Sequence, residues 1–139
     1  RGIRHKNAPR SAAAWAAVSA PGNRVLGVWR PHGYGPLRAM LAPLADAFAA
    51  VCRAQDRLWL LPVYDAGGTA NRTVHSGELA DELRARGVHA AQAATYEELG
   101  EQLASAARAG DTILIMGARD PRLPVFAREM AARTAAVKE

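Results

Sequence analysis

The sequence predicts a three-layer, Rossmann-like α/β domain in which helices cover both faces of a mainly parallel sheet. Three observations predict this fold. Strand-length apolar runs alternate with helical patterns, in the order of one helix followed by four strand–helix units. The runs are almost continuously apolar, which is typical of strands buried on both faces. The chain has 139 residues, the length of one domain.

The predicted strands are short apolar runs bounded by turn signals. The last run is the clearest, because it is rich in β-branched residues, and the third is the weakest. Pro62 fits near the end of the second strand, because proline cannot donate a hydrogen bond to a neighbouring strand. The four runs are residues 24–29, 58–63, 88–93 and 112–116.

The predicted helices follow apolar residues that recur at helical spacing. Pro43 lies within the second helical pattern, where it either kinks the helix or marks a start a few residues later. Gly87 ends the third helix, Thr95 and Glu98 form a capping box for the fourth, and Asp120 caps the last. The helical patterns cover residues 9–19, 37–52, 76–86, 95–108 and a final stretch after Asp120.

Composition narrows the class of protein. Hydrophobic residues make up 50% of the chain and charged residues 22%, as in globular domains. No apolar run approaches the length of a membrane span, and the first six residues do not resemble a signal peptide, so we expect a cytoplasmic protein without a membrane partner. The single cysteine, Cys52, excludes an internal disulfide and lies in a helical apolar stripe, where we expect a core residue.

The net charge of +5 comes almost entirely from arginine, since Lys6 and Lys138 are the only lysines. Beyond a small cluster in the first ten residues, the arginines are scattered along the chain. A nucleic-acid-binding surface gathers its basic residues on one face or helix. We therefore expect no nucleic-acid partner.

Candidate site residues lie in three loops, which the predicted topology brings to one edge. In open parallel sheets, ligands bind beyond the carboxyl ends of the strands. The loops that follow the first, second and fourth predicted strands carry polar groups suited to this position. They are residues 30–36, 64–75 and 117–120.

Each loop has a ligand-binding and a structural interpretation. His32 and Tyr34 can exchange protons, stack or donate, or they belong to a rigid solvated turn. Asp65 can accept from a hydroxyl or amine, or it lies in an ordinary flexible loop. Arg119 can bind an anion at the start of the last helix, whereas Asp120 caps that helix under either interpretation.

Several signatures are missing from the sequence. It contains no G-x-x-x-x-G-K-[ST] phosphate loop, no G-x-G-x-x-G fingerprint and no G-x-S-x-G elbow. The four histidines show no metal-ligand spacing. The sequence therefore predicts no catalytic residue and no metal ligand in this chain.

Two stretches resemble the C-terminal domain of the Mur ligases, closest to the ligases that join muramate to alanine. The family's Q-P-H-x-Y segment is similar to RPHGY at residues 30–34. The family's last strand follows Gly-Asp and ends in Gly-Ala with an Asp close behind, which resembles GDTILIMGARD at residues 110–120. Pro9 matches the last residue of the family's D-x-x-H-N-P motif, so the resemblance spans nearly the whole chain.

The resemblance implies a role in ATP-dependent amide-bond formation. Mur ligases activate a carboxylate as an acyl phosphate, which an amino acid's amine then attacks, in peptidoglycan biosynthesis for the cell wall. Their central domain carries the phosphate loop and the magnesium ligands, and their C-terminal domain closes over it. The resemblance thus implies ATP and magnesium in the full-length ligase, with neither bound by this domain alone. It also implies two partners: the central ATPase domain and a small amino-acid substrate.

Nucleotide- or substrate-binding residues follow from the matched stretches and the predicted edge: His32, Tyr34, Arg38, Asp65, Gly117, Arg119 and Asp120. The chain departs from the family at D-x-x-H-N-P, where Arg4, Asn7 and Ala8 replace Asp, His and Asn. It also lacks the Thr-Arg pair that follows the tyrosine in muramate–alanine ligases, and Arg38 is the nearest cation.

We interpret residues 1–139 as a single domain of a longer ligase, with flexible ends at 1–8 and 135–139. Two alternatives stay open: a freestanding, non-catalytic α/β module that binds a nucleotide or anionic metabolite, and a basic interaction module.

Overall fold

The computed structural model describes residues 7–31, 34–63, 76–117 and 120–134. The predicted flexible ends fall largely outside these ranges, although Asn7 and Ala8 lie in the first turn of a helix. The helices are α1 (Asn7–Val18), α2 (Tyr34–Val51), α3 (Ser76–Ala85), α4 (Tyr96–Ala106) and α5 (Arg122–Thr134). The strands are β1 (Val25–Arg30), β2 (Arg57–Leu60), β3 (Ala90–Gln92) and β4 (Thr112–Gly117).

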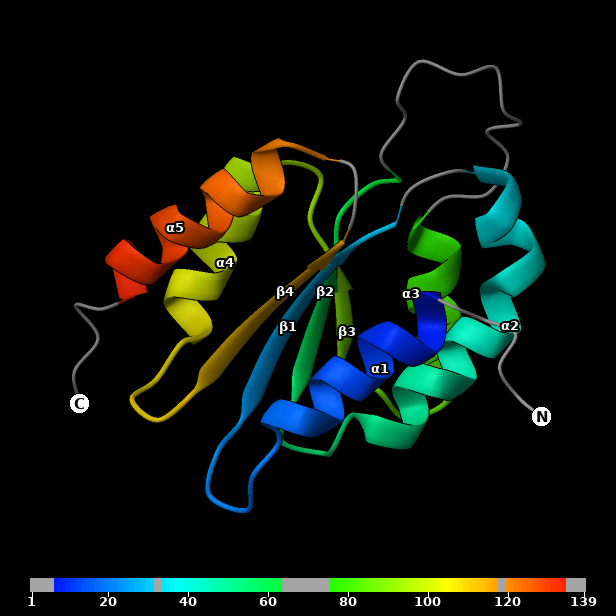
Figure 1. Ribbon diagram of the computed structural model, residues 1–139, viewed down its shortest axis with the longest axis horizontal. Coiled ribbons are helices and arrows are strands. Elements are labelled where there is room, and N and C mark those ends of the chain that lie inside the picture. The colour runs from blue at the N-terminus through cyan, green and yellow to red at the C-terminus, as the bar shows by residue number, and fades with distance from the viewer. Residues whose placement is uncertain (1–6, 32–33, 64–75, 118–119, 135–139) are drawn as a thin grey trace.

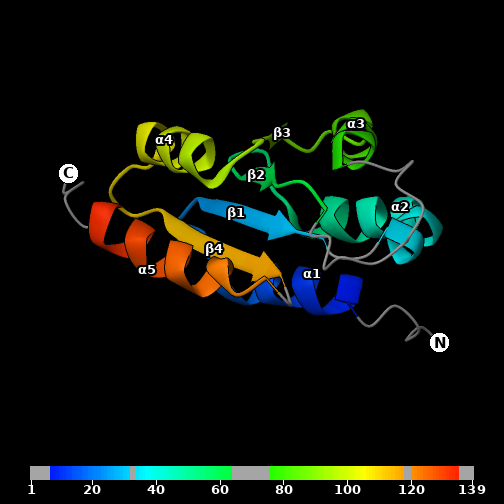
Figure 2. The same cartoon turned by 90° about the horizontal axis from the view of Figure 1, so that it is seen from above.

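Within the described residues, the four strands form one parallel sheet in the order β3-β2-β1-β4 (Figure 2). β1 is central, and its Trp29 stands in register with Leu60 of β2 and Met116 of β4. β2 and β3 are parallel as well. The predicted parallel sheet is confirmed, and its topology places the carboxyl ends of all four strands at one edge.

Helices cover both faces of the sheet, which confirms the three-layer prediction. α1, α2 and α3 lie on one side of the sheet and α4 and α5 on the other (Figure 1). Successive residues of β1 face opposite layers: Val25 and Trp29 join the core under α1–α3, whereas Leu26 and Val28 join the core under α4 and α5. This alternation explains why the strand has no polar side chain between Val25 and Trp29.

Trp15 fixes α1 against the sheet. Its indole is fully buried and packs edge-on against Phe48 of α2, with ring centroids 6.3 Å apart. A Cβ atom at Gly27 would lie 2.0 Å from the Trp15 ring, so the glycine in β1 permits the close approach of the indole. The Trp15 Nε1–H donates to the buried carboxylate of Asp56, at 3.0 Å.

The helix ends follow the sequence signals. Gly87 has φ of +87°, and the Val88 N–H returns to the Leu83 carbonyl, as expected at a helix C-terminus. At the start of α4, the Thr95 hydroxyl accepts from the Glu98 N–H, and the Glu98 carboxylate accepts from the Ala94 N–H rather than from Thr95 itself. The capping box is thus confirmed with a shift of one residue in its return bond.

Two elements differ from expectation. α2 begins at Tyr34 and continues through Pro43, so the alternative of a later start is wrong. The apolar face of α2 is held by Leu44, Ala45 and Phe48 in the core, which offsets the hydrogen bond that proline cannot donate.

β3 has only three residues, and its alanines supply little side-chain area to bury.

Candidate functional site

We expect the site at the carboxyl edge of the sheet, and four of its seven predicted residues lie in the described chain. Gly117 ends β4, and Asp120 lies just before α5. Tyr34 and Arg38 lie in the first two turns of α2, where only the backbone is described. His32, Asp65 and Arg119 lie outside the described residues, so their convergence with the others stays a prediction.

Four side chains meet at this edge, and we call them the carboxyl-edge cluster: Arg30, Tyr96, Asp120 and Arg122. Arg30 ends β1, and its Nη1 lies 3.3 Å from Oδ2 of Asp120. The Tyr96 hydroxyl, from the first residue of α4, donates to the same carboxylate oxygen. The cluster thus joins the carboxyl end of β1 to the N-terminal ends of α4 and α5.

Asp120 serves as the cap that the sequence predicts. Its Oδ1 accepts from the Arg122 N–H at 2.9 Å, and its backbone carbonyl accepts from the Leu123 N–H at 3.1 Å. The residue is only 8% exposed, so its charge depends on these donors and on Arg30. Asp120 therefore supplies the negative charge that the N-terminus of α5 favours.

The Tyr96 ring lies between two guanidinium groups. The Cζ atoms of Arg30 and Arg122 lie 5.5 Å and 5.1 Å from its centroid, within the range of cation–π contacts. The ring also packs against Phe126, with centroids 5.0 Å apart. Burial, together with the hydrogen bond to Asp120, raises the pKa of Tyr96 to about 12. Tyr96 is therefore a neutral hydroxyl donor at physiological pH.

Gly117 has a packing role at this edge. It stands in register with Arg30 and has φ of +152°. A Cβ atom there would lie 2.8 Å from Leu123 Cδ2 and 3.1 Å from the Arg30 carbonyl oxygen. Close packing between β4, β1 and α5 thus accounts for the glycine, and a contact between Gly117 and a ligand stays a prediction.

The cluster offers cations rather than a nucleophile or a metal site. The Arg122 side chain is 46% exposed, whereas that of Arg30 is 18% exposed and held by Asp120. A guanidinium matches the geometry of phosphate and carboxylate groups. Across the described ranges, no three His, Cys, Asp or Glu side chains gather as metal ligands.

Cys52 is a partly buried residue packed against the core under α1–α3, as predicted. Burial raises the pKa of its thiol to about 12, and the nearby charge of Asp56 acts in the same direction. A thiol with such a pKa is almost entirely protonated at neutral pH, so it is a poor nucleophile.

Sequence reasoning missed Tyr96 and Arg122 as members of this cluster, and it named Arg30 only as part of a loop. Tyr96 follows a helix cap, and nothing in the sequence distinguishes this position from an ordinary position on a helix surface. The available signal was topological, because the first turn of a helix after a parallel strand lies at the carboxyl edge.

Comparison with known proteins shows a clear relationship. No family model matches the chain. It is 38% identical over 107 residues to the UDP-N-acetylmuramate–L-alanine ligase of Brucella ovis, and the same holds for the Brucella suis protein. It is 30% identical over 105 residues to the enzyme of that name from Clostridium tetani. These matches cover 76% of this chain but 22% of each relative, so the chain spans about a fifth of their length.

The parallel sheet, its two helical layers and the polar cluster at its carboxyl edge define a Rossmann-like α/β domain. The identity over three-quarters of the chain makes it a relative of the Mur ligases. Of the helices described, none is long and apolar enough to cross a membrane.

Proposed function

We propose that this chain is the C-terminal domain of a Mur-type, ATP-dependent acid–amino-acid ligase that acts in peptidoglycan biosynthesis in the cytoplasm. The domain closes over a central ATPase domain and contributes to binding of the nucleotide and the incoming amino acid. The identity of up to 38% to UDP-N-acetylmuramate–L-alanine ligases is the observation that carries this proposal.

Two further observations support it. The chain spans about a fifth of the length of those ligases, as a single domain of a multidomain enzyme does. Its sequence also lacks the lysine-bearing phosphate loop that ATP chemistry of this type requires. In the proposal, the central domain supplies that loop and the ligands for magnesium, and ATP activates the carboxylate that the amino acid's amine attacks.

The role of this chain's residues is recognition of anionic groups at the carboxyl edge. Arg122 presents an exposed guanidinium beside the Tyr96 ring, and it can form charge-assisted hydrogen bonds with a phosphate or carboxylate. Arg30 is held in a mostly buried pair with Asp120, whereas the pair of Arg122 with Glu129, at 3.6 Å, is exposed on both sides. The sequence adds His32, Tyr34, Arg38, Asp65 and Arg119 to this proposed surface.

The test is steady-state kinetics on the whole polypeptide that contains this chain. We expect Arg122→Gln to lower kcat/KM for ATP or the amino acid by roughly tenfold or more, which is the size of one charge-assisted contact. Arg128→Gln is the matched control, because Arg128 is exposed on the same helix but lies outside the cluster.

Two outcomes contradict the proposal. Equal kinetics for Arg122→Gln and Arg128→Gln would remove Arg122 from the binding surface. A reading frame that starts near residue 1, with no phosphate loop upstream, would instead favour the freestanding, non-catalytic module that binds a nucleotide or anionic metabolite.

A further inference from the structure

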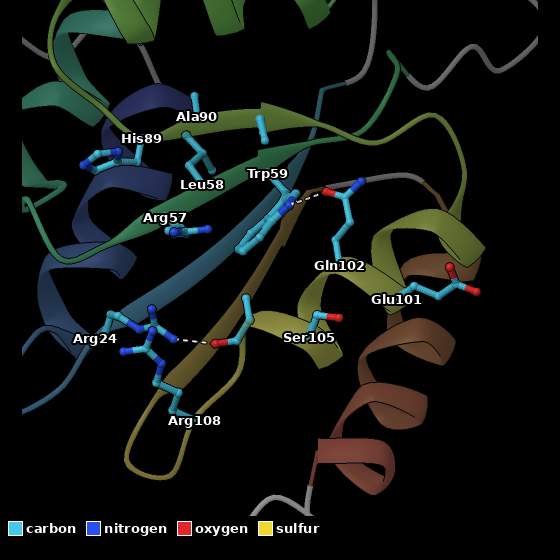
Figure 3. A pocket seen from close by; sticks show the side chains of 12 residues that line it. Arg24, Arg57, Leu58, Trp59, His89, Ala90, Glu101, Gln102, Ser105 and Arg108 are labelled. Carbon is cyan, nitrogen blue, oxygen red and sulfur yellow. Dashed lines mark hydrogen bonds between the residues drawn. The ribbon is translucent and has the colours of Figure 1, made fainter.

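A groove opens at the amino edge of the sheet, opposite the carboxyl-edge cluster. It has a volume of about 820 Å³ and lies between β2, β3 and the second half of α4 (Figure 3). Leu58 and Trp59 of β2 line it together with their partners in register, Ala90 and Ala91 of β3. This volume is within the range of about 300–1,000 Å³ that is usual for small-molecule sites.

The groove is rich in basic side chains. Arg24 precedes β1, Arg57 begins β2, His89 precedes β3 and Arg108 follows α4. Because the strands are parallel, these positions fall at the same edge although they are far apart in sequence. Figure 3 shows the guanidinium groups of Arg24, Arg57 and Arg108 at one end of the groove.

Arg57 and Arg108 supply the excess charge. Neither side chain forms an ion pair or hydrogen bond with the described part of the chain, and both residues are exposed. The charge of Arg24 is offset, because its Nε and Nη2 donate to the two carboxylate oxygens of Asp111 at 3.1 Å and 2.6 Å. Glu101 also lines the groove, and Figure 3 shows it at the end opposite the arginines.

The walls of the groove are fixed by hydrogen bonds. Arg24 Nη2 also donates to the Ala106 carbonyl at 2.6 Å, which ties the end of α4 to the start of β1. The Trp59 Nε1–H donates to Gln102 Oε1 at 2.8 Å, which ties α4 to β2. A groove with such walls needs little reorganisation when a ligand enters, which favours affinity.

We propose that this amino-edge groove binds a small, multivalent anion that carries phosphate or carboxylate groups. Arg57 and Arg108 bind the anionic groups, because a guanidinium offers paired donors that match both chemistries. The Ser105 hydroxyl, which also lines the groove, adds a neutral donor. The inference is independent of the proposed ligase function, which concerns the opposite edge.

The experiment is a titration of the full 139-residue chain with pyrophosphate and, in parallel, with citrate, monitored by amide chemical shifts. We expect shifts to cluster at residues 57–59, 89–91 and 105–108. The double substitution R57Q/R108Q should weaken binding of the preferred anion by about tenfold or more. A preference for pyrophosphate indicates a phosphorylated ligand, and a preference for citrate indicates a carboxylated one.

The control again uses Arg128→Gln, which removes one positive charge from a residue that does not line the groove and should change affinity by less than about twofold. Thermal midpoints check that the variants are folded, since the substituted side chains have no described partner to lose. Shifts spread over all surface arginines, or equal weakening in R57Q/R108Q and Arg128→Gln, would overturn the proposal.

Discussion

Arg30 and Asp120 form an ion pair that joins the end of β1 to the start of α5, with Nη1 and Oδ2 3.3 Å apart. Both side chains are mostly buried, at 18% and 6% exposure. The Tyr96 hydroxyl and the Arg122 N–H complete the surroundings of the carboxylate. The Asp120 carboxylate is thus bound by groups of the fold itself, and the exposed cation of the cluster is Arg122.

Asp120→Ala should lower the free energy of unfolding by about 2–3 kcal/mol. The loss exceeds that of an ordinary helix cap, because Arg30 and Tyr96 also lose a buried partner. Urea unfolding of the two proteins measures it. Glu129→Ala is the control: its pair with Arg122 is exposed on both sides and should contribute less than about 1 kcal/mol. Equal losses in the two variants would show that the cluster adds nothing to stability.

The Tyr96 hydroxyl should lose its proton at a higher pH than an ordinary tyrosine, and the stability of the fold should fall as it does so. Its pKa is about 12 in the fold, because of burial and the hydrogen bond to Asp120, and its ordinary value is 10.0. A raised pKa means that the neutral hydroxyl stabilises the fold. This contribution is complete below pH 10 and is lost as pH rises through about 12.

Absorbance of the phenolate band follows this titration directly. We expect Tyr96→Phe to remove the transition near pH 12 and to leave the other tyrosine transitions in place. A wild-type titration in which no tyrosine titrates later than the ordinary value would contradict the burial of this hydroxyl.

Gly27→Ala tests the packing of α1 on β1. The added Cβ would lie 2.0 Å from the Trp15 ring, so the indole has to move out of a fully buried position. We expect a loss of about 1–3 kcal/mol in the free energy of unfolding, which is the range typical of overpacked cores. Gly22→Ala is the control, because no atom lies within 4 Å of its new Cβ. The chemical shift of the Trp15 indole N–H, compared between the variants, reports whether the indole has moved.

Asp56 should be the most sensitive acidic residue in the core. It is 1% exposed and accepts from the Trp15 indole, the Val25 N–H and the Arg53 guanidinium. Asp56→Ala leaves these donors without an acceptor, so we expect a loss of about 3 kcal/mol or more in urea unfolding. Asp81→Ala, which breaks an exposed pair with Arg84, should cost less than about 1 kcal/mol.

Asp56 should also make the stability of the fold depend on pH in the acid range. Burial disfavours the charged carboxylate, but hydrogen bonds from Arg53, Val25 and Trp15 outweigh it and hold the pKa of Asp56 below its ordinary 3.8. Its contribution to stability is therefore present above pH 3.8 and is lost as pH falls through the lower folded value. Unfolding midpoints in this acid range should depend less on pH in Asp56→Asn than in the wild type.

Local sequence signals predict most of the fold. The continuous apolar run of β1 follows from burial on both faces, and the ends of α3 and α4 follow from Gly87 and Thr95. The start of α2 was harder to predict, because Pro43 breaks the local pattern while the burial of Phe48 and Leu44 stabilises the helix around it. Tertiary packing outweighs local preference at that position.

The site was less predictable than the fold. Asp120 follows from its position before a helix, but its partners Arg30 and Tyr96 lie 90 and 24 residues earlier in the chain. Only the order of strands and helices brings them together. The amino-edge groove is built in the same way, from residues that precede or begin different strands, and no local motif marks it.

Release of ADP is the most direct measurement of the ligase assignment. Two purified proteins are compared in the presence of magnesium, ATP, UDP-N-acetylmuramate and an amino-acid mixture: residues 1–139 alone, and the whole polypeptide of their reading frame. We predict amino-acid-dependent ADP release by the whole polypeptide and none by residues 1–139, whose sequence lacks a phosphate-loop lysine. ATP turnover by residues 1–139 alone, or a whole polypeptide that releases no ADP, would contradict it.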